Sequence, residues 1–481
     1  MNPEQAWTPL PPAQWDRYTA RHLASRIGFS LHPSIISEFL ELGPKAIVEK
    51  YLLQPQQMTQ LPSLISMRAA VKEFQMKDAG GKREMRKQLQ KQNREGYEEY
   101  AVAWNQFARQ KQYSPQEKLC LFFQNVWVVA SQGVKGVPML FEYQNKIRQS
   151  IAGNYPEMCK RLTLTSAMGR YLNLDKNKAG APNENFAREL FELFTLGEGN
   201  YTEADIKEAA RALTGYSFET DGTVSFRERA HDSGLKTVFG YQGRHNIDDL
   251  FEIVFEQPAA ATFLPKELLR FYLSESDFDS SIIEVLGKMW RESGYSLPFL
   301  YSTIFSSQLF YQEEFRGNMI KSPVHYFIGL HQDFEIEILP LPRECLRIER
   351  LMGQAFFNPP NVKGWDGGRA WINSATLAAR RQVAETLLQD LNTDRLNADE
   401  LRVLDQAKQN GISPAYRIDL DKIIEKGTTP EKLAEDLFIG QDAAFLAELN
   451  ESLLEDENRL TTSSLRELLL AAINSPAYQL C

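Results

Sequence analysis

The densest group of chemically capable side chains lies in the stretch NENFARELFE, residues 183–192. On a helix, the polar residues of this stretch recur at i, i+3, i+4 and i+7 and share one face. Two carboxylates one turn apart beside a guanidinium could form a general acid/base pair or hold a divalent cation. The alternative is a purely structural set of i, i+4 ion pairs, Glu184–Arg188 and Arg188–Glu192. The candidate catalytic residues are Glu189 and Glu192, and the candidate binding residues are Asn183, Asn185 and Arg188.

A second cluster is HDSGLK at residues 231–236. A histidine beside an aspartate, followed by glycine and lysine, suits proton transfer or anion binding. The alternative is a His–Asp pair that only caps a turn. His231 and Asp232 are therefore candidate catalytic residues, and Lys236 is a candidate binding residue.

The third cluster is the loop NPPNVKGWDGGRAWIN, residues 358–373. Paired prolines and three glycines dictate an irregular backbone, and tryptophans with charged and amide side chains are typical of carbohydrate-facing or interface loops. The alternative is a structural loop anchored by its tryptophans. The candidate binding residues are Lys363, Trp365, Asp366, Arg369, Trp371 and Asn373.

Other common catalytic and ligand-binding motifs are missing from the sequence. The six histidines form no HxxxH, HxH or HExxH pattern, so no metal site is predicted. There is no GxSxG, no P-loop and no GxGxxG in a strand–helix context, so the usual nucleophile and nucleotide sites are unsupported. The sequence identifies no cofactor.

The elements that must position these clusters are mainly helical, because apolar residues recur with the 3.6-residue helical period through most of the chain. Thr202 and Asp205 have the spacing of a capping box, and Pro115 suits the first position of a helix. The interval 216–243 breaks the helical pattern, and its apolar runs predict three short strands at 217–218, 224–226 and 237–239. We expect a mainly α, multi-helix bundle-like fold with a small β-hairpin insertion near 216–243.

Four segments are predicted along the chain. They are an N-terminal helical segment at 1–60, a charged helical stretch at 61–113, a helical core with the three clusters and the β insertion at 114–385, and a C-terminal helical region at 386–481. The charged stretch contains a basic group that is either a solvated helical face or a patch for a polyanion. Its members are Lys82, Arg83, Arg86, Lys87, Lys91 and Arg94.

Composition limits the function classes further. The 63 acidic and 54 basic residues give a net charge of −9, which argues against a nucleic-acid partner. The N-terminal sequence has no basic n-region or apolar h-region, and no apolar run approaches the roughly 18 residues of a membrane span. We expect no transmembrane segment and a cytoplasmic location, or export as the folded passenger of a signal-bearing partner.

Long strings of the sequence carry a family resemblance. APNENFARELFELFTLGEGNYTEADIKEAARALTGYSF, HDSGLKTVFG and FNPPNVKGWDGGRAWINSATLAARR resemble the bacterial "domain of unknown function 1800" family, and the match covers nearly the whole chain. The resemblance implies no activity. It implies a partner, a sulfatase/phosphatase-like exported protein of the "domain of unknown function 1501" family. Where relatives read Trp-His-Asn-His-Phe, this chain has Phe-Gln-Asn-Val-Trp at 123–127, which puts a histidine-based metal site in doubt.

Two functions follow from the sequence. One is an accessory or partner role for the sulfatase-like protein, with the 358–373 loop as an interface. The other is a hydrolase that acts on a glycan or other envelope substrate through glutamate, histidine, aspartate and arginine side chains. The hydrolase interpretation requires the three clusters to converge in one cleft, since the catalytic groups must each lie within about 3 Å of one reacting atom. Whether the protein is an enzyme is left open by the sequence.

Overall fold

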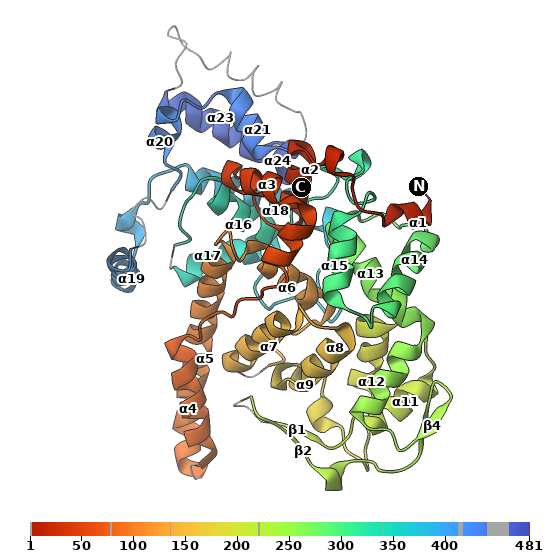
Figure 1. Ribbon diagram of the computed structural model, residues 1–481. Coiled ribbons are helices and arrows are strands. Elements are labelled where there is room, and N and C mark those ends of the chain that lie inside the picture. The colour runs from red at the N-terminus through yellow and green to blue at the C-terminus, as the bar shows by residue number, and fades with distance from the viewer. Residues whose placement is uncertain are drawn as a thin grey trace.

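Helices form nearly all of the regular secondary structure, as predicted (Figure 1). The computed structural model describes residues 2–76, 79–134, 136–219, 222–339, 341–411, 417–439 and 461–481. In these ranges the strands form only two small antiparallel hairpins. No helix in the same ranges is long and apolar enough to cross a bilayer.

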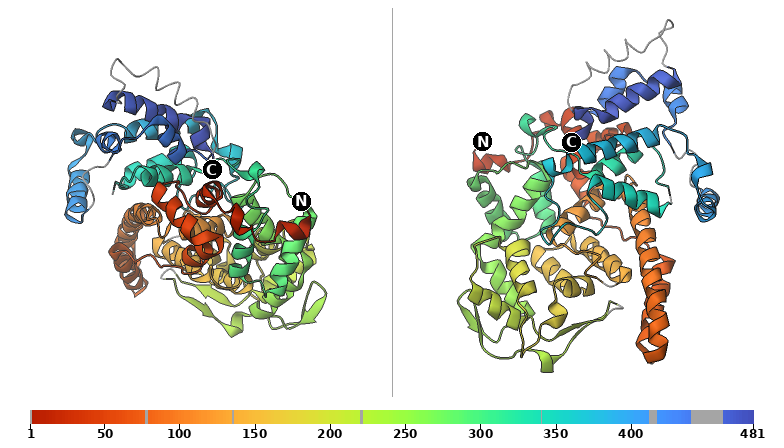
Figure 2. Two further views of the ribbon diagram at one scale, coloured as in Figure 1. Left: turned by 45° about the horizontal axis from the view of Figure 1, so that its top comes forward. Right: turned by 180° about the vertical axis from the view of Figure 1, so that it is seen from behind.

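The first part of the chain begins with short helices and continues into a long helical pair. The elements are α1 (Pro3–Ala6), η1 (Pro12–Gln14), α2 (Arg17–Ile27), α3 (Pro33–Tyr51), α4 (Pro62–Met76) and α5 (Ala79–Ala108). α3 is kinked where Gly43 adopts φ +74° and Pro44 follows. Helices α4 and α5 pack against each other and form an arm that runs beside the body (Figures 1 and 2).

The body begins with a run of shorter helices. They are α6 (Ser114–Val126), α7 (Val137–Ser150), α8 (Tyr155–Thr163), α9 (Ser166–Tyr171), η2 (Leu174–Lys176), α10 (Asn185–Glu189), η3 (Leu190–Thr195) and α11 (Glu203–Ala212). Pro115 lies in the first turn of α6, and Thr202 with Asp205 forms a capping box at the start of α11. Both helix starts were predicted correctly from local sequence.

The short η4 (Glu228–Ala230) lies within the β insertion, and after the insertion the chain returns to helices. The body is completed by α12 (Ile247–Glu256), α13 (Pro258–Tyr272), α14 (Ser280–Glu292), α15 (Leu297–Ser306), η5 (Glu313–Phe315), α16 (Pro323–Asp333), α17 (Pro342–Met352), η6 (Gly368–Trp371) and α18 (Ser374–Leu387). The C-terminal region contains η7 (Thr393–Arg395), α19 (Ala398–Gln409), α20 (Leu420–Glu425), α21 (Pro430–Leu437), α23 (Thr462–Asn474) and α24 (Pro476–Gln479).

The β insertion is larger than predicted. Strands β1 (Tyr216–Phe218) and β2 (Val224–Phe226) form one hairpin, and β3 (Lys236–Val238) and β4 (Tyr241–Gly243) form another. The three predicted strands are present, but β4 was missed because YQG carries no apolar alternation. Thr237 pairs with Gln242, so the second hairpin is held by backbone pairing and by its packing on α11.

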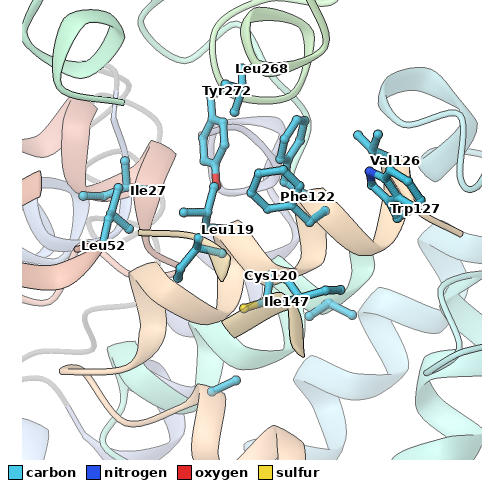
Figure 3. Close-up of a cluster of buried hydrophobic side chains, with 14 of the residues drawn as sticks. Ile27, Leu52, Leu119, Cys120, Phe122, Val126, Trp127, Ile147, Leu268 and Tyr272 are labelled. Carbon is cyan, nitrogen blue, oxygen red and sulfur yellow. The ribbon is translucent and has the colours of Figure 1, made fainter. Parts of the chain in front are cut away.

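The core is organised around α6 (Figure 3). Its residues Leu119, Cys120 and Phe122 are at most 2% exposed, and side chains from α2, α7 and α13 surround them. One buried ion pair lies beside this apolar cluster: Arg148 contacts Glu117 at 2.7 Å, and both side chains are fully buried. A pair of this kind is costly to break, because the remaining charge would be buried alone.

Candidate functional site

A cleft of about 1210 Å³ opens between α6, α13 and the loop that follows residue 362. Its lining joins segments that are far apart in the sequence: α2, α6, η3, α13, α14, the start of α16, residues 363–371 and Cys481. A cleft of this volume can hold a ligand larger than a small metabolite.

The helical period explains the two long walls of the cleft. On α6, residues 118, 121, 122, 125 and 126 fall at i, i+3, i+4, i+7 and i+8 and line the cleft as one stripe. On α13, residues 259, 262, 263, 266, 267, 270 and 271 do the same. The α13 stripe mixes Phe263 and Phe271 with Glu267, so an apolar wall carries a carboxyl group.

Glu192 reaches the cleft from an unusual helical turn. Residues 190–195 form a π-helix, in which the Leu196 amide donates to the Phe191 carbonyl five residues earlier. Such wider turns are rare and often occur at functional sites. Glu192 accepts a hydrogen bond from the Tyr201 hydroxyl at 2.8 Å and lies 3.7 Å from the Lys363 ammonium. The first and third sequence clusters therefore meet at this carboxylate.

The loop of the third cluster is clamped to α6 by Asn125. The Trp365 amide donates to Asn125 Oδ1 at 2.8 Å, and Asn125 Nδ2 donates to the Trp365 carbonyl at 3.3 Å. Gly364 has φ +82°, and a Cβ there would overlap the Asn125 side-chain oxygen. The glycine is required both by its left-handed backbone and by this close approach.

A second glycine brings the loop onto another carboxyl group. Gly368 has φ +50°, and a Cβ at this position would overlap the Glu275 carboxyl group. Glu275 lines the cleft, and burial raises its pKa against the opposing effect of Arg270 and Arg369. The backbone of the loop is thus in contact with an acid that sequence reasoning did not single out.

Glu267 is the one acidic residue of α13, and it is half-buried. Burial raises its pKa, and Arg270 and Lys266 oppose that shift. No hydrogen bond to its carboxyl group is found among the described residues. In contrast, the hydrogen bond from Lys363 lowers the pKa of Glu198 at the edge of the cleft. The cleft therefore holds acids in different electrostatic environments, as acid/base chemistry requires.

The rest of the first cluster lies outside the cleft lining. Arg188 forms a two-pronged pair with Glu203 at 2.7 Å and a longer one with Glu184 at 3.5 Å, so the expected Arg188–Glu192 pair is wrong. The side-chain oxygen of Asn183 accepts from the Asn185 amide, and Asn185 Nδ2 donates to the Leu172 carbonyl. Burial and the neighbouring Glu192 raise the pKa of Glu189, which is not among the lining residues.

The second cluster fastens the β insertion to α11. Asp232 accepts two hydrogen bonds from Arg211, at 2.7 and 3.2 Å, and one from the Gly234 amide. Lys236 is buried and donates to the carbonyls of Asp232 and Gly234, while His231 Nδ1 lies 3.0 Å from the Thr214 carbonyl. None of His231, Asp232 and Lys236 is among the residues that line the cleft. The three clusters do not all converge, and a catalytic role for this one stays a prediction.

The third cluster divides between the cleft and its support. Lys363, Trp365, Asp366 and Trp371 line the cleft. Asn373 instead caps α18 by accepting from the amides of Ala375 and Thr376. Arg369 is not among the lining residues but acts electrostatically on Glu275.

One end of the cleft is formed by basic and polar side chains that sequence reasoning missed. Arg26, Lys118, Ser322, His325 and Gln354 line it, and we refer to these five as the cationic end. The only local signal was a lysine within the apolar sequence of α6, and nothing in the sequence places α2 and α16 beside it.

In the ranges that the structure describes, no group of three or more histidine, cysteine, aspartate or glutamate side chains is arranged to hold a metal ion. Of the two positions where the resembling family has histidines, Val126 lines the cleft and Gln124 is not among the lining residues.

Comparison with known proteins gives one match. A family model described as "Protein of unknown function (DUF1800)" matches residues 22–480, nearly the whole chain. No curated protein and no solved structure matches the chain.

Proposed function

The chain belongs to the DUF1800 family, and we propose that this member is a hydrolase that cleaves a glycan in the cleft between α6, α13 and the 363–371 loop. One observation carries the proposal: the half-buried Glu267 carboxyl, whose pKa burial raises, lies in the same cleft as Glu192. Aromatic side chains beside carboxyl groups suit sugar rings, whose apolar faces stack on them.

This chemistry needs two carboxyl groups of the cleft, Glu267 and Glu192, and not the convergence of all three sequence clusters. Glu267 stays protonated to higher pH and would donate its proton to the oxygen of the leaving sugar. Glu192 would accept the proton of the attacking water, held in place by Tyr201 and Lys363. Helices α13 and η3 are in contact, so the two carboxyl groups come from neighbouring elements of the cleft lining.

The test uses a panel of bacterial envelope glycans and measures the release of reducing ends. We expect Glu267→Gln to lower kcat by at least about 100-fold, the usual contribution of a general acid, without a lower melting temperature. The raised pKa of Glu267 also predicts that kcat/KM falls on the basic side of the profile as this group loses its proton.

Glu284→Gln is the matched control, because Glu284 lines the same cleft from α14 but is exposed. Activity within about twofold of wild type is expected for this variant, as for most surface changes. Equal losses in the two variants, or no reducing ends from any glycan in the panel, would refute the hydrolase proposal.

A second candidate, the accessory role for a sulfatase-like exported protein, is supported by the helical arm. Exposed basic side chains follow α5 along the arm, on a chain whose net charge is −9: Arg83, Arg86, Lys87, Lys91 and Arg94. An acidic partner surface would match this charge. The test is co-expression of the two proteins followed by size-exclusion chromatography. Elution of wild type and partner in one peak, which the double variant Lys87→Glu with Arg94→Glu separates into two, supports the accessory role. Elution of wild type and partner in two peaks refutes it.

A further inference from the structure

The cationic end of the cleft gathers buried positive charge from several helices. Arg26 of α2 and Lys118 of α6 line it and are 1% and 7% exposed. Lys321 and Arg380 are not among the lining residues but are close enough to act electrostatically on His325. Four cationic side chains thus surround one histidine inside the protein.

In the part of the chain that the structure describes, these charges form no ion pair with a carboxylate side chain. Among the described residues, no acidic side chain lies within 4.0 Å of the cationic nitrogens of Arg26, Lys118, Lys321 or Arg380. Arg26 donates to the Phe315 carbonyl and to Asn318, and its Nε and Nη1 are buried without an acceptor. Unpaired buried cations are expensive, so a site of this composition favours an anion.

Lys118 contributes charge to this end of the cleft, while its three N–H groups are used inside the protein. Lys118 Nζ donates to the carbonyls of Ser25 and Gly28 and lies 3.2 Å from His325 Nδ1. Because Nδ1 accepts from this ammonium, the imidazole proton is on Nε2, which is free to donate.

Two neutral donors complete the set. Ser322 Oγ accepts from the His325 amide, and Gln354 Oε1 accepts from the Val324 amide at 3.0 Å. Each is thereby fixed through its oxygen, and no acceptor for the Ser322 hydroxyl proton or the Gln354 amide protons is found in the described part of the chain. The convergence of donors in front of buried cations is the arrangement that proteins use for oxyanions.

We propose that the cationic end is a subsite for a tetrahedral oxyanion, a phosphate or sulfate group carried by the ligand of the cleft. The substrate class follows only from the proposed hydrolase, whose substrate would then be a phosphorylated or sulfated glycan. The subsite itself stands on the donor set and does not depend on catalysis.

The protonation of the lysines provides an independent readout. Burial lowers the pKa of Lys118 to about 7 and that of Lys321 to about 8, with opposing effects from the Cys481 thiol on both and from Asp333 on Lys321. The other charged groups that face them are Arg26 and Arg380. An anion stabilises the charged form of each lysine, so binding near pH 8 takes up protons.

The experiment is titration calorimetry of the full chain with inorganic phosphate and inorganic sulfate, in two buffers of different ionisation enthalpy at pH 8. We expect saturable binding with proton uptake, and Lys118→Met should weaken it at least about tenfold because a charge behind the anion is lost. Gln354→Met, which removes only a neutral donor, should weaken it several-fold. Lys266→Met is the matched control, because Lys266 is an exposed lysine of the same cleft, and should leave affinity within about twofold.

The outcomes separate the alternatives. Equal affinity of wild type and Lys118→Met, or no binding up to about 10 mM of either anion, refutes the subsite. Acetate binding as tightly as phosphate refutes the tetrahedral assignment. Comparing the affinities for glucose 6-phosphate and glucose 6-sulfate identifies which ester the subsite prefers. Phosphate binding that persists in Glu267→Gln keeps the subsite even where the hydrolase proposal fails.

Discussion

The contact between Gly364 and Asn125 makes one prediction that can be worked out in detail. Gly364→Ala adds a methyl group where φ is +82° and where the Asn125 carbonyl oxygen would be 2.9 Å away. The methyl group also overlaps the Asn125 side chain, which must leave its place against Trp365. The substitution therefore strains one residue and unfastens the loop from α6.

The magnitude follows from these parts. A non-glycine residue in the left-handed region costs about 1–2 kcal/mol. Losing the hydrogen bonds between Asn125 and Trp365 costs about 1 kcal/mol each. Gly364→Ala should lower the free energy of unfolding by about 3–4 kcal/mol in wild type but by only about 1–2 kcal/mol in an Asn125→Ala background, where the clamp is already gone.

The assay is urea unfolding of the four proteins of this double-mutant cycle, followed by tryptophan fluorescence. Gly180→Ala is the control, because a Cβ there meets nothing within 4 Å and its backbone is not left-handed. The control should change stability by less than about 0.5 kcal/mol. An equal cost of Gly364→Ala in both backgrounds would show that Asn125 does not hold the loop, and the reasoning would be wrong.

Two further predictions concern buried and half-buried acids. Burial raises the pKa of Glu349 to about 7 from 4.5, so between these pH values the folded state holds a proton that the unfolded state has lost. The free energy of unfolding should therefore fall by about 3 kcal/mol as the pH rises from 4.5 through 7. Chemical unfolding at several pH values should show this decrease in wild type and not in Glu349→Gln. Asp232→Ala removes the double hydrogen bond with Arg211 and should cost about 2 kcal/mol. Amide hydrogen exchange in this variant should then be faster in the β insertion and unchanged in α6. Unchanged exchange in the β insertion would contradict the conclusion that Asp232 holds the insertion to α11.

Local sequence determined most of the helices. Thr202 and Asp205 specify a helix start through contacts within one turn, and Pro115 lies in the first turn of α6. The missed strand β4 and the π-turn at 190–195 show the limit of this reasoning. Strand pairing and a wider helical turn depend on what lies alongside, which the local pattern does not contain.

The candidate site was predictable in part. The sequence indicated Glu192 and the 363–371 loop by their polar residue types, and the structure brings them together through Lys363. It could not indicate Glu267, because a single glutamate in an amphipathic helix resembles any solvated residue. Its half-burial arises only when α13 packs beside α6 and η3.

The sequence by itself determined the helical class, the helix caps and the glycines of the 363–371 loop, because these depend on periodicity and on local backbone chemistry. Only the tertiary structure decided which polar residues share a cleft and which serve as fasteners. It separated His231 and Asp232 from Glu192, and it placed Arg26, Lys118 and His325 around one end of the cleft. Burial and charge proximity belong to the packed molecule, since each depends on residues distant along the chain.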